Sequence, residues 1–79
     1  MVNAHEINLG VTTFEQFRDN NYIIVQVGDI EVNDYILFRQ VEGEAETPTG
    51  LFSMTQVKRI VQDKGLKDGY ALLVTTKLS

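Results

Sequence analysis

Residues 65–74 read Gly-Leu-Lys-Asp-Gly-Tyr-Ala-Leu-Leu-Val, a polar turn that leads directly into an apolar segment. Residues 32–38, Val-Asn-Asp-Tyr-Ile-Leu-Phe, show the same arrangement earlier in the chain. Gly65, Gly69 and Asn33 are residue types that accept positive φ, so the chain can reverse just before it becomes extended. The apolar residues that follow suit a pleated, largely buried surface. Two such units in a chain of 79 residues predict a compact sheet curled on itself.

The length and composition predict a single domain, residues 1–79. A chain this short buries only about 60–65% of its unfolded surface, so its core is small. It has no cysteine for a disulfide and no cysteine–histidine set for structural zinc. The N-terminus lacks a signal-peptide pattern, and the apolar runs are far shorter than a membrane span. We therefore expect a cytoplasmic protein with no metal, cofactor or membrane association.

The charge of the chain is unevenly distributed. The formal net charge of −4 argues against a general binder of polyanions. Residues 29–46 hold six acids and one arginine, whereas residues 47–79 hold five basic residues and two acids. One part of the surface can therefore be basic on an acidic molecule. A solvated surface of mixed charge is the simpler interpretation of the same pattern.

A short strand at residues 5–9 is expected to lead into a helix. Thr12 and Glu15 have the spacing of a capping box, which predicts that Thr12 is the N-cap of the helix. Phe14 and Phe17 would share one face of this helix, because residues three or four apart are neighbours on its surface.

The rest of the chain is expected to form strands separated by turns and one polar loop. Residues 22–27 are almost continuously apolar, which predicts a strand buried on most sides. Residues 42–49 are polar and should form an exposed, mobile loop, with Pro48 outside any strand ladder. Further strands are expected at residues 35–41, 51–61 and 70–78, although the apolar spacing in 51–61 also fits a helix. Five or six short strands with one helix predict a mainly β (α+β) fold, a small, partly closed antiparallel barrel.

Several short motifs occur along the chain in a fixed order. They are His5-Glu6-Ile7, Phe14-Glu15-Gln16-Phe17, Val32-Asn33-Asp34, Thr49-Gly50 and the Gly-Leu-Lys-Asp-Gly-Tyr of residues 65–70. In order and spacing they resemble the ASCH domains of the PUA-like superfamily, and within it a small bacterial and phage-associated group. The resemblance covers nearly the whole chain. It implies a small PUA-like β-barrel that binds RNA or a nucleotide-like small molecule.

The chain departs from this family where some relatives carry catalytic residues. Those relatives hydrolyse acetylated cytidine with a threonine nucleophile, a lysine that activates it and a glutamate that acts as acid and base. Where the family pattern is Gly-Lys-Lys-Thr-Phe-Glu-Ile-Arg, residues 19–26 are Asp-Asn-Asn-Tyr-Ile-Ile-Val-Gln. The lysine, threonine and glutamate are thus all replaced. We expect no catalysis and assign no catalytic residue.

The resemblance places the candidate ligand site at Asn20, Asn21, Tyr22 and Gln26, where relatives line their cleft. Amide side chains can read the edge of a base, and a tyrosine ring can stack on its face. The competing interpretation is a pair of asparagines that ends the helix before a core strand. Basic side chains that could approach a phosphate are Arg39, Lys58, Arg59 and Lys67, although ordinary surface charge is the favoured interpretation of them. On a strand, Lys58 and Arg59 would point to opposite faces.

Two other functions stay open at this point. A degenerate amidohydrolase for a modified nucleoside would need a nucleophile, for which Thr12 or Thr13 is the nearest candidate. A protein-interaction domain of a mobile element would bind no nucleotide at all. A metal site is not expected, because His5 is the only histidine and the acidic residues 42–46 lack the spacing of a calcium loop.

Overall fold

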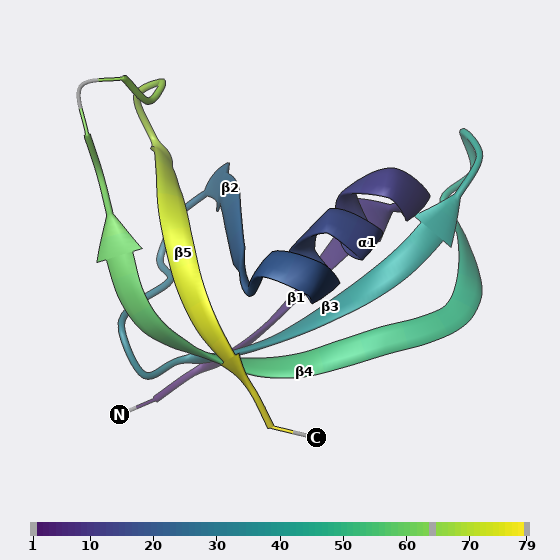
Figure 1. Cartoon of the computed structure of the whole chain (residues 1–79), viewed down its shortest axis with the longest axis horizontal. Coiled ribbons are helices and arrows are strands. Elements are labelled where there is room, and N and C mark those ends of the chain that lie inside the picture. The colour runs from purple at the N-terminus through teal and green to yellow at the C-terminus, as the bar shows by residue number, and fades with distance from the viewer. Residues whose placement is uncertain (1, 64, 79) are drawn as a thin grey trace.

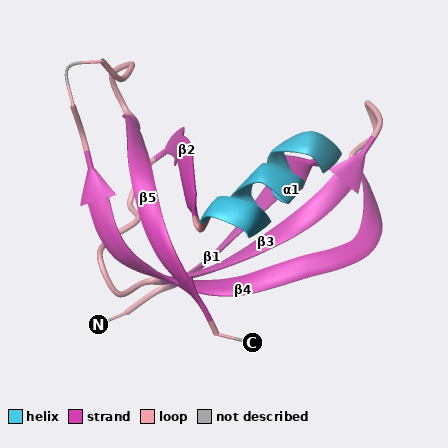
Figure 2. Ribbon diagram, viewed as in Figure 1, coloured by secondary structure: helices cyan, strands magenta, loops and turns pink. Residues whose placement is uncertain are grey.

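The computed structural model describes residues 2–63 and 65–78, which form a curled five-stranded sheet with one helix. The strand order across the sheet is β1-β3-β4-β5-β2. The sheet bends into a half-barrel, and the helix lies between its two arms (Figures 1 and 2). The mainly β fold with one short helix is therefore confirmed. The elements in chain order are β1 (Ala4–Gly10), α1 (Val11–Asn20), β2 (Tyr22–Gln26), β3 (Tyr35–Glu42), β4 (Thr47–Val61) and β5 (Tyr70–Lys77).

The sheet is mixed, and the expectation of a wholly antiparallel sheet is wrong for one pair. β1 runs parallel to β3, from Ala4 opposite Tyr35 to Gly10 opposite Val41, while every other pair is antiparallel. A tight hairpin enforces antiparallel pairing only between strands that it joins directly. Because α1 and β2 intervene between β1 and β3, these two strands are free to align in parallel.

The helix begins two residues earlier than the capping-box motif predicts, because its N-cap is Gly10 and not Thr12. Its first residue is Val11, and Gly10 before it is extended, with φ −62° and ψ 164°, and provides no side-chain cap. Thr12 is therefore inside the first turn, and the predicted capping box with Glu15 is wrong. The reason is tertiary, because pairing with β3 holds β1 extended as far as Gly10.

The core lies between α1 and the concave face of the sheet. The predicted helix face is confirmed, since Phe14 and Phe17 are both buried. The Phe17 ring packs on that of Phe38 in β3, with 4.3 Å between the ring centroids. The helix contacts mainly β3 and β1. The buried apolar cluster comprises Leu9, Phe14, Phe17, Ile23, Ile30, Ile36, Phe38, Val57 and Leu73.

β2 is less buried than its apolar sequence predicts. Ile23 is only 7% exposed, but its neighbours Tyr22 and Ile24 are 51% and 53% exposed. β2 is the last strand of the sheet, and only alternate side chains of a strand reach the core. The prediction of a strand buried on most sides is therefore wrong.

The expected polar loop is shorter than predicted, because β4 already begins at Thr47. The reversal is completed by Gly43 and Glu46, which have φ values of 74° and 51°. Pro48 lies opposite Val41 within the ladder, contrary to expectation. β5 reaches β4 only at Thr55 and beyond, so β4 has a strand on one side at Pro48 and tolerates the missing N–H. The strands expected at residues 35–41, 51–61 and 70–78 are confirmed.

Within residues 2–63 and 65–78, no helix combines the length and the apolar character that a membrane crossing requires.

Candidate functional site

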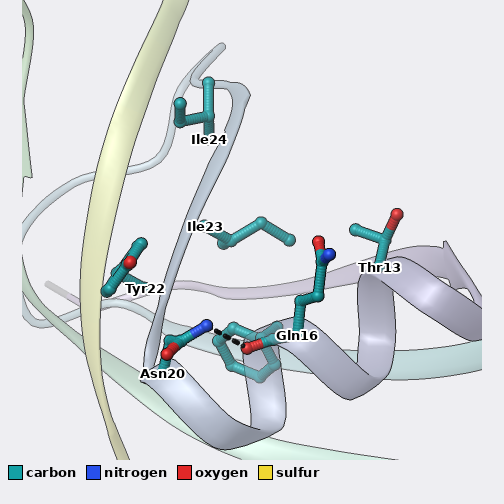
Figure 3. A pocket seen from close by; sticks show the side chains of 7 residues that line it. Thr13, Gln16, Asn20, Tyr22, Ile23 and Ile24 are labelled. Carbon is teal, nitrogen blue, oxygen red and sulfur yellow. Dashed lines mark hydrogen bonds between the residues drawn. The ribbon is translucent and has the colours of Figure 1, made fainter.

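A hollow of about 410 Å³ lies between α1 and β2, and we call it the α1–β2 groove (Figure 3). The helix supplies one wall and the strand supplies the other. Phe17 and Ile23, which are both buried, form its apolar base. The lining residues are Thr13, Gln16, Phe17, Asn20, Tyr22, Ile23 and Ile24.

The helix wall of the groove is polar. Thr13, Gln16 and Asn20 follow one another at intervals of three and four residues, which places them on one face of α1. The side-chain amide of Asn20 donates a 2.9 Å hydrogen bond to the backbone oxygen of Gln16. The carbonyl oxygen of the Asn20 side chain is not used in that bond. The side-chain amide of Gln16 extends from the helix beside Thr13 (Figure 3).

The strand wall of the groove is an edge of β2. Three consecutive residues, Tyr22 to Ile24, line the hollow. Successive side chains of a strand point to opposite faces of its sheet. Three in a row can therefore reach one hollow only where that hollow runs along the edge of the strand. The groove thus combines a polar helix face with the outer edge of a strand.

Only two of the predicted ligand residues meet in the groove, Asn20 and Tyr22. Asn21 ends the helix in a left-handed conformation, with φ 62°, and its N–H donates to Phe17. Its carbonyl oxygen accepts bonds from the backbone N–H and the hydroxyl of Thr75. The helix-ending interpretation therefore explains Asn21. Gln26 lies at the other end of β2 and is not among the lining residues.

The predicted basic residues do not line the groove, and they are spread along the sheet. Arg39 is opposite Phe52 on β4, whereas Lys58 is about 20 Å further along β4 at ~3.3 Å per residue. Arg39 also pairs with Glu6, at 3.6 Å between Arg Nη2 and Glu Oε1. Lys67 precedes β5 and lies 5.8 Å from the ring centre of Tyr70.

The predicted opposition of Lys58 and Arg59 assumed a regular strand, and β4 is irregular at this point. The ladder between β4 and β5 shifts between Val57 and Arg59, which marks a bulge around Lys58. A bulge adds one residue to a strand and interrupts the alternation of its side chains. Both Lys58 and Arg59 are exposed.

Sequence reasoning did not select Gln16 or Ile24 as part of the site. The spacing of four residues between Gln16 and Asn20 could have placed both on one helix face, but only once the bounds of α1 were known. Thr13, the candidate nucleophile of a degenerate hydrolase, does line the groove. The lining residues include no lysine, histidine or carboxylate that could take its proton.

A second polar cluster surrounds Asp34 and was also not predicted. Asp34 is 1% exposed, and its carboxylate accepts the N–H groups of Asn3 and Glu31 at 3.0 and 2.9 Å. Nε2 of His5 lies 2.8 Å from the same carboxylate. The bond from Asn3, followed by those from His5 and Glu31, lowers the pKa of Asp34 from 3.8 to about 2. We call this cluster the Asp34 clasp, because it joins the start of β1 to the turn before β3.

No protein-family model matches this chain, and no curated protein is significantly similar to it. The α1–β2 groove is therefore the candidate site on its own geometry.

Proposed function

We propose that this protein is a non-catalytic binding module that holds a nucleobase-bearing ligand in the α1–β2 groove. The ligand is a nucleotide-like small molecule or a nucleotide of single-stranded RNA. The observation that carries the proposal is that Gln16, Asn20 and Tyr22 line one hollow of about 410 Å³. Small-molecule sites typically have volumes of about 300–1,000 Å³. The resemblance to ASCH domains supports the same location, because it places the family's cleft at residues 19–26.

The groove offers each kind of contact that recognition of a base requires. The Gln16 amide presents a donor and an acceptor side by side, which can pair with the edge of a base. The half-exposed ring of Tyr22 can stack on the face of that base. Phe17 and Ile23 provide the apolar base on which a planar ring can rest.

The distribution of charge favours a small ligand over a long RNA. Arg39, Lys58 and Lys67 are dispersed, and the net charge of the chain is −4. Single-stranded RNA affinity depends on salt with a slope of about 0.7 per neutralised phosphate. Any RNA affinity should therefore be modest and salt-sensitive, with a slope of about 1.4–2.8 for contact with ~2–4 phosphates. A nucleoside that is held in the groove without a phosphate contact should bind with little dependence on salt.

The test is an NMR titration with the four nucleosides, their monophosphates and short single-stranded RNAs. We expect amide and side-chain shifts to cluster at Gln16, Asn20 and Tyr22. Loss of a hydrogen bond typically costs about 0.5–1.5 kcal/mol, so Gln16→Ala should raise Kd by roughly 2- to 12-fold. The matched control is Asn8→Ala on the exposed face of β1, at the opposite edge of the sheet.

Two results would contradict the proposal. Shifts that are scattered over the sheet, or that are unchanged in Gln16→Ala, would remove the groove as the site. Steady release of acetate from acetylated cytidine would show that the module is catalytic.

A further inference from the structure

The edge of β2 that lines the groove is the end of the sheet, with no further strand beside it in the described chain. Its other edge is bonded to β5. At one end of this pair, the N–H of Thr75 donates to the carbonyl of Asn21 at 2.9 Å. At the other end, the N–H of Val27 donates to the carbonyl of Gly69 at 2.8 Å. The bonds to β5 thus come from odd-numbered positions of this segment.

The even-numbered residues of β2 direct their backbone groups away from β5. Along an antiparallel strand, residues alternate between those bonded to the neighbouring strand and those directed outward. The N–H and C=O groups of Tyr22 and Ile24 therefore point away from β5, within the plane of the sheet, toward the groove. These groups repeat every second residue, at ~7 Å, which matches the backbone of another extended chain.

The residues of β2 themselves include none of the types that usually protect an edge against strand pairing, and the α1–β2 groove separates this edge from the helix. The sequence of β2 is Tyr-Ile-Ile-Val-Gln, with no charged residue, proline or glycine. Native sheets commonly protect an exposed edge with charges, prolines or bulges. β1, at the opposite edge, carries the charged side chain of Glu6. The difference marks the β2 edge as a surface for pairing.

The outer face of the sheet indicates which side chains such a partner would present. Ile24 lies opposite Leu72 of β5, and Leu72 lies opposite Val61 of β4. Tyr22 lies opposite Val74 in the next row. The first row is apolar across three strands, whereas the second is apolar only on β2 and β5, because Val74 lies opposite Arg59 of β4. Both rows stop at the free edge, where Tyr22 and Ile24 are about half exposed. An added strand with apolar residues at alternate positions would continue both rows.

We propose that the free edge of β2 binds an extended, uncharged peptide segment of a partner protein by strand addition. The segment carries β-branched or aromatic residues at the alternate positions that lie beside Tyr22 and Ile24. Backbone hydrogen bonds supply affinity in this mode of recognition, and alternate side chains supply specificity. The inference goes beyond the proposed function and does not depend on it. Because both ligands use the α1–β2 groove, each excludes the other.

The test uses a fluorescent seven-residue peptide of alternating valine and threonine with blocked ends, followed by anisotropy and amide hydrogen exchange. We expect saturable binding and slower exchange at the amides of Tyr22 and Ile24. Ile24→Pro removes an outward N–H without removing a bond to β5, and should weaken binding at least ~10-fold. Ile24→Val is the matched control, because it keeps both the N–H and a β-branched side chain.

A second peptide keeps the test decisive even if Ile24→Pro does not fold. It carries N-methyl groups at alternate residues, which removes the donors on one edge of the peptide. Methyl groups on the odd or on the even positions give two versions of the peptide. Only the version that keeps its N–H groups on the edge facing β2 should bind the wild-type protein. The proposal is wrong if both versions bind equally, if Ile24→Pro binds as well as Ile24→Val, or if the peptide leaves exchange at the amides of Tyr22 and Ile24 unchanged. Gln16→Ala leaves the backbone edge of β2 intact, so it should weaken nucleoside binding while strand addition persists, and failure of one proposal is separable from failure of the other.

Discussion

The two edge strands of this sheet, β1 and β2, differ in their contacts and in their charge. At the β1 edge, the Asp34 clasp holds the start of the strand, and Glu6 pairs with Arg39 on the neighbouring strand. At the β2 edge, the strand follows the helix through Asn21 alone and presents uncharged, half-exposed residues. The β1 edge is therefore fixed and charged, whereas the β2 edge is open. The candidate site lies at the edge where packing is incomplete.

The position of α1 explains why the groove lies on the β2 side. The helix contacts mainly β3 and β1, and Phe17 packs against Phe38 of β3. It therefore covers one arm of the half-barrel and leaves space toward the other, as the gap between α1 and β2 in Figure 3 illustrates. A helix centred between the arms would have filled the groove with its own side chains.

The largest expected effect comes from removing the contact that holds α1 on the β1 side. Phe17→Ala deletes a fully buried ring and should lower the free energy of unfolding by about 3–5 kcal/mol. Urea unfolding followed by circular dichroism measures this change. The matched control is Phe52→Ala, since Phe52 is 65% exposed and its loss should cost no more than about 0.5 kcal/mol. Equal losses in the two variants would mean that α1 is not anchored through Phe17.

A smaller effect is expected from the Asp34 clasp, and it depends on pH. The pKa of Asp34 is lowered from 3.8 to about 2 in the folded protein, so folding favours the charged carboxylate. Its contribution to stability is therefore fully present above pH 3.8 and is lost as the pH falls toward 2. Asp34→Asn should lower stability at neutral pH and flatten this acid dependence.

Thermal unfolding between pH 2 and pH 7 measures the effect of the clasp. Asp29→Asn is the matched control, because Asp29 is exposed in the turn after β2. An acid dependence that is the same in Asp34→Asn and in the wild type would contradict the assignment of this dependence to Asp34.

The helix and strands of this fold can be predicted from local sequence patterns, but which strands lie side by side cannot. Asn33 and Gly69 have φ values of 77° and 84°, as the turn-and-strand motifs predict, and a strand follows each turn. The parallel pairing of β1 and the place of Pro48 in the ladder depend on which strands lie side by side. The same holds for the exposure of Ile24, since its partner Leu72, on a strand with neighbours on both sides, is less exposed. These properties depend on contacts between residues far apart in the chain.

The candidate site was predictable to a similar degree. The resemblance to ASCH domains selected Asn20 and Tyr22, and the two residues meet in the groove because a helix end and a strand start are adjacent in the chain. The dispersal of Arg39, Lys58 and Lys67 depends on the register between strands and on a bulge, which no local motif reports. The Asp34 clasp joins residues about thirty positions apart, and nothing in the sequence linked His5 to Asp34.

The smallest expected effect tests whether the charge on β1 protects that edge. The ion pair of Glu6 and Arg39 is exposed, so Glu6→Val should change the free energy of unfolding by no more than about 1 kcal/mol. The variant should nevertheless self-associate more than the wild type, because an uncharged edge strand invites pairing. Sedimentation velocity at several concentrations measures association, with Glu15→Val on the exposed surface of α1 as the matched control. If both variants remain as monomeric as the wild type, the charge of Glu6 is not what separates the two edges, and the difference must lie in the clasp at the start of β1.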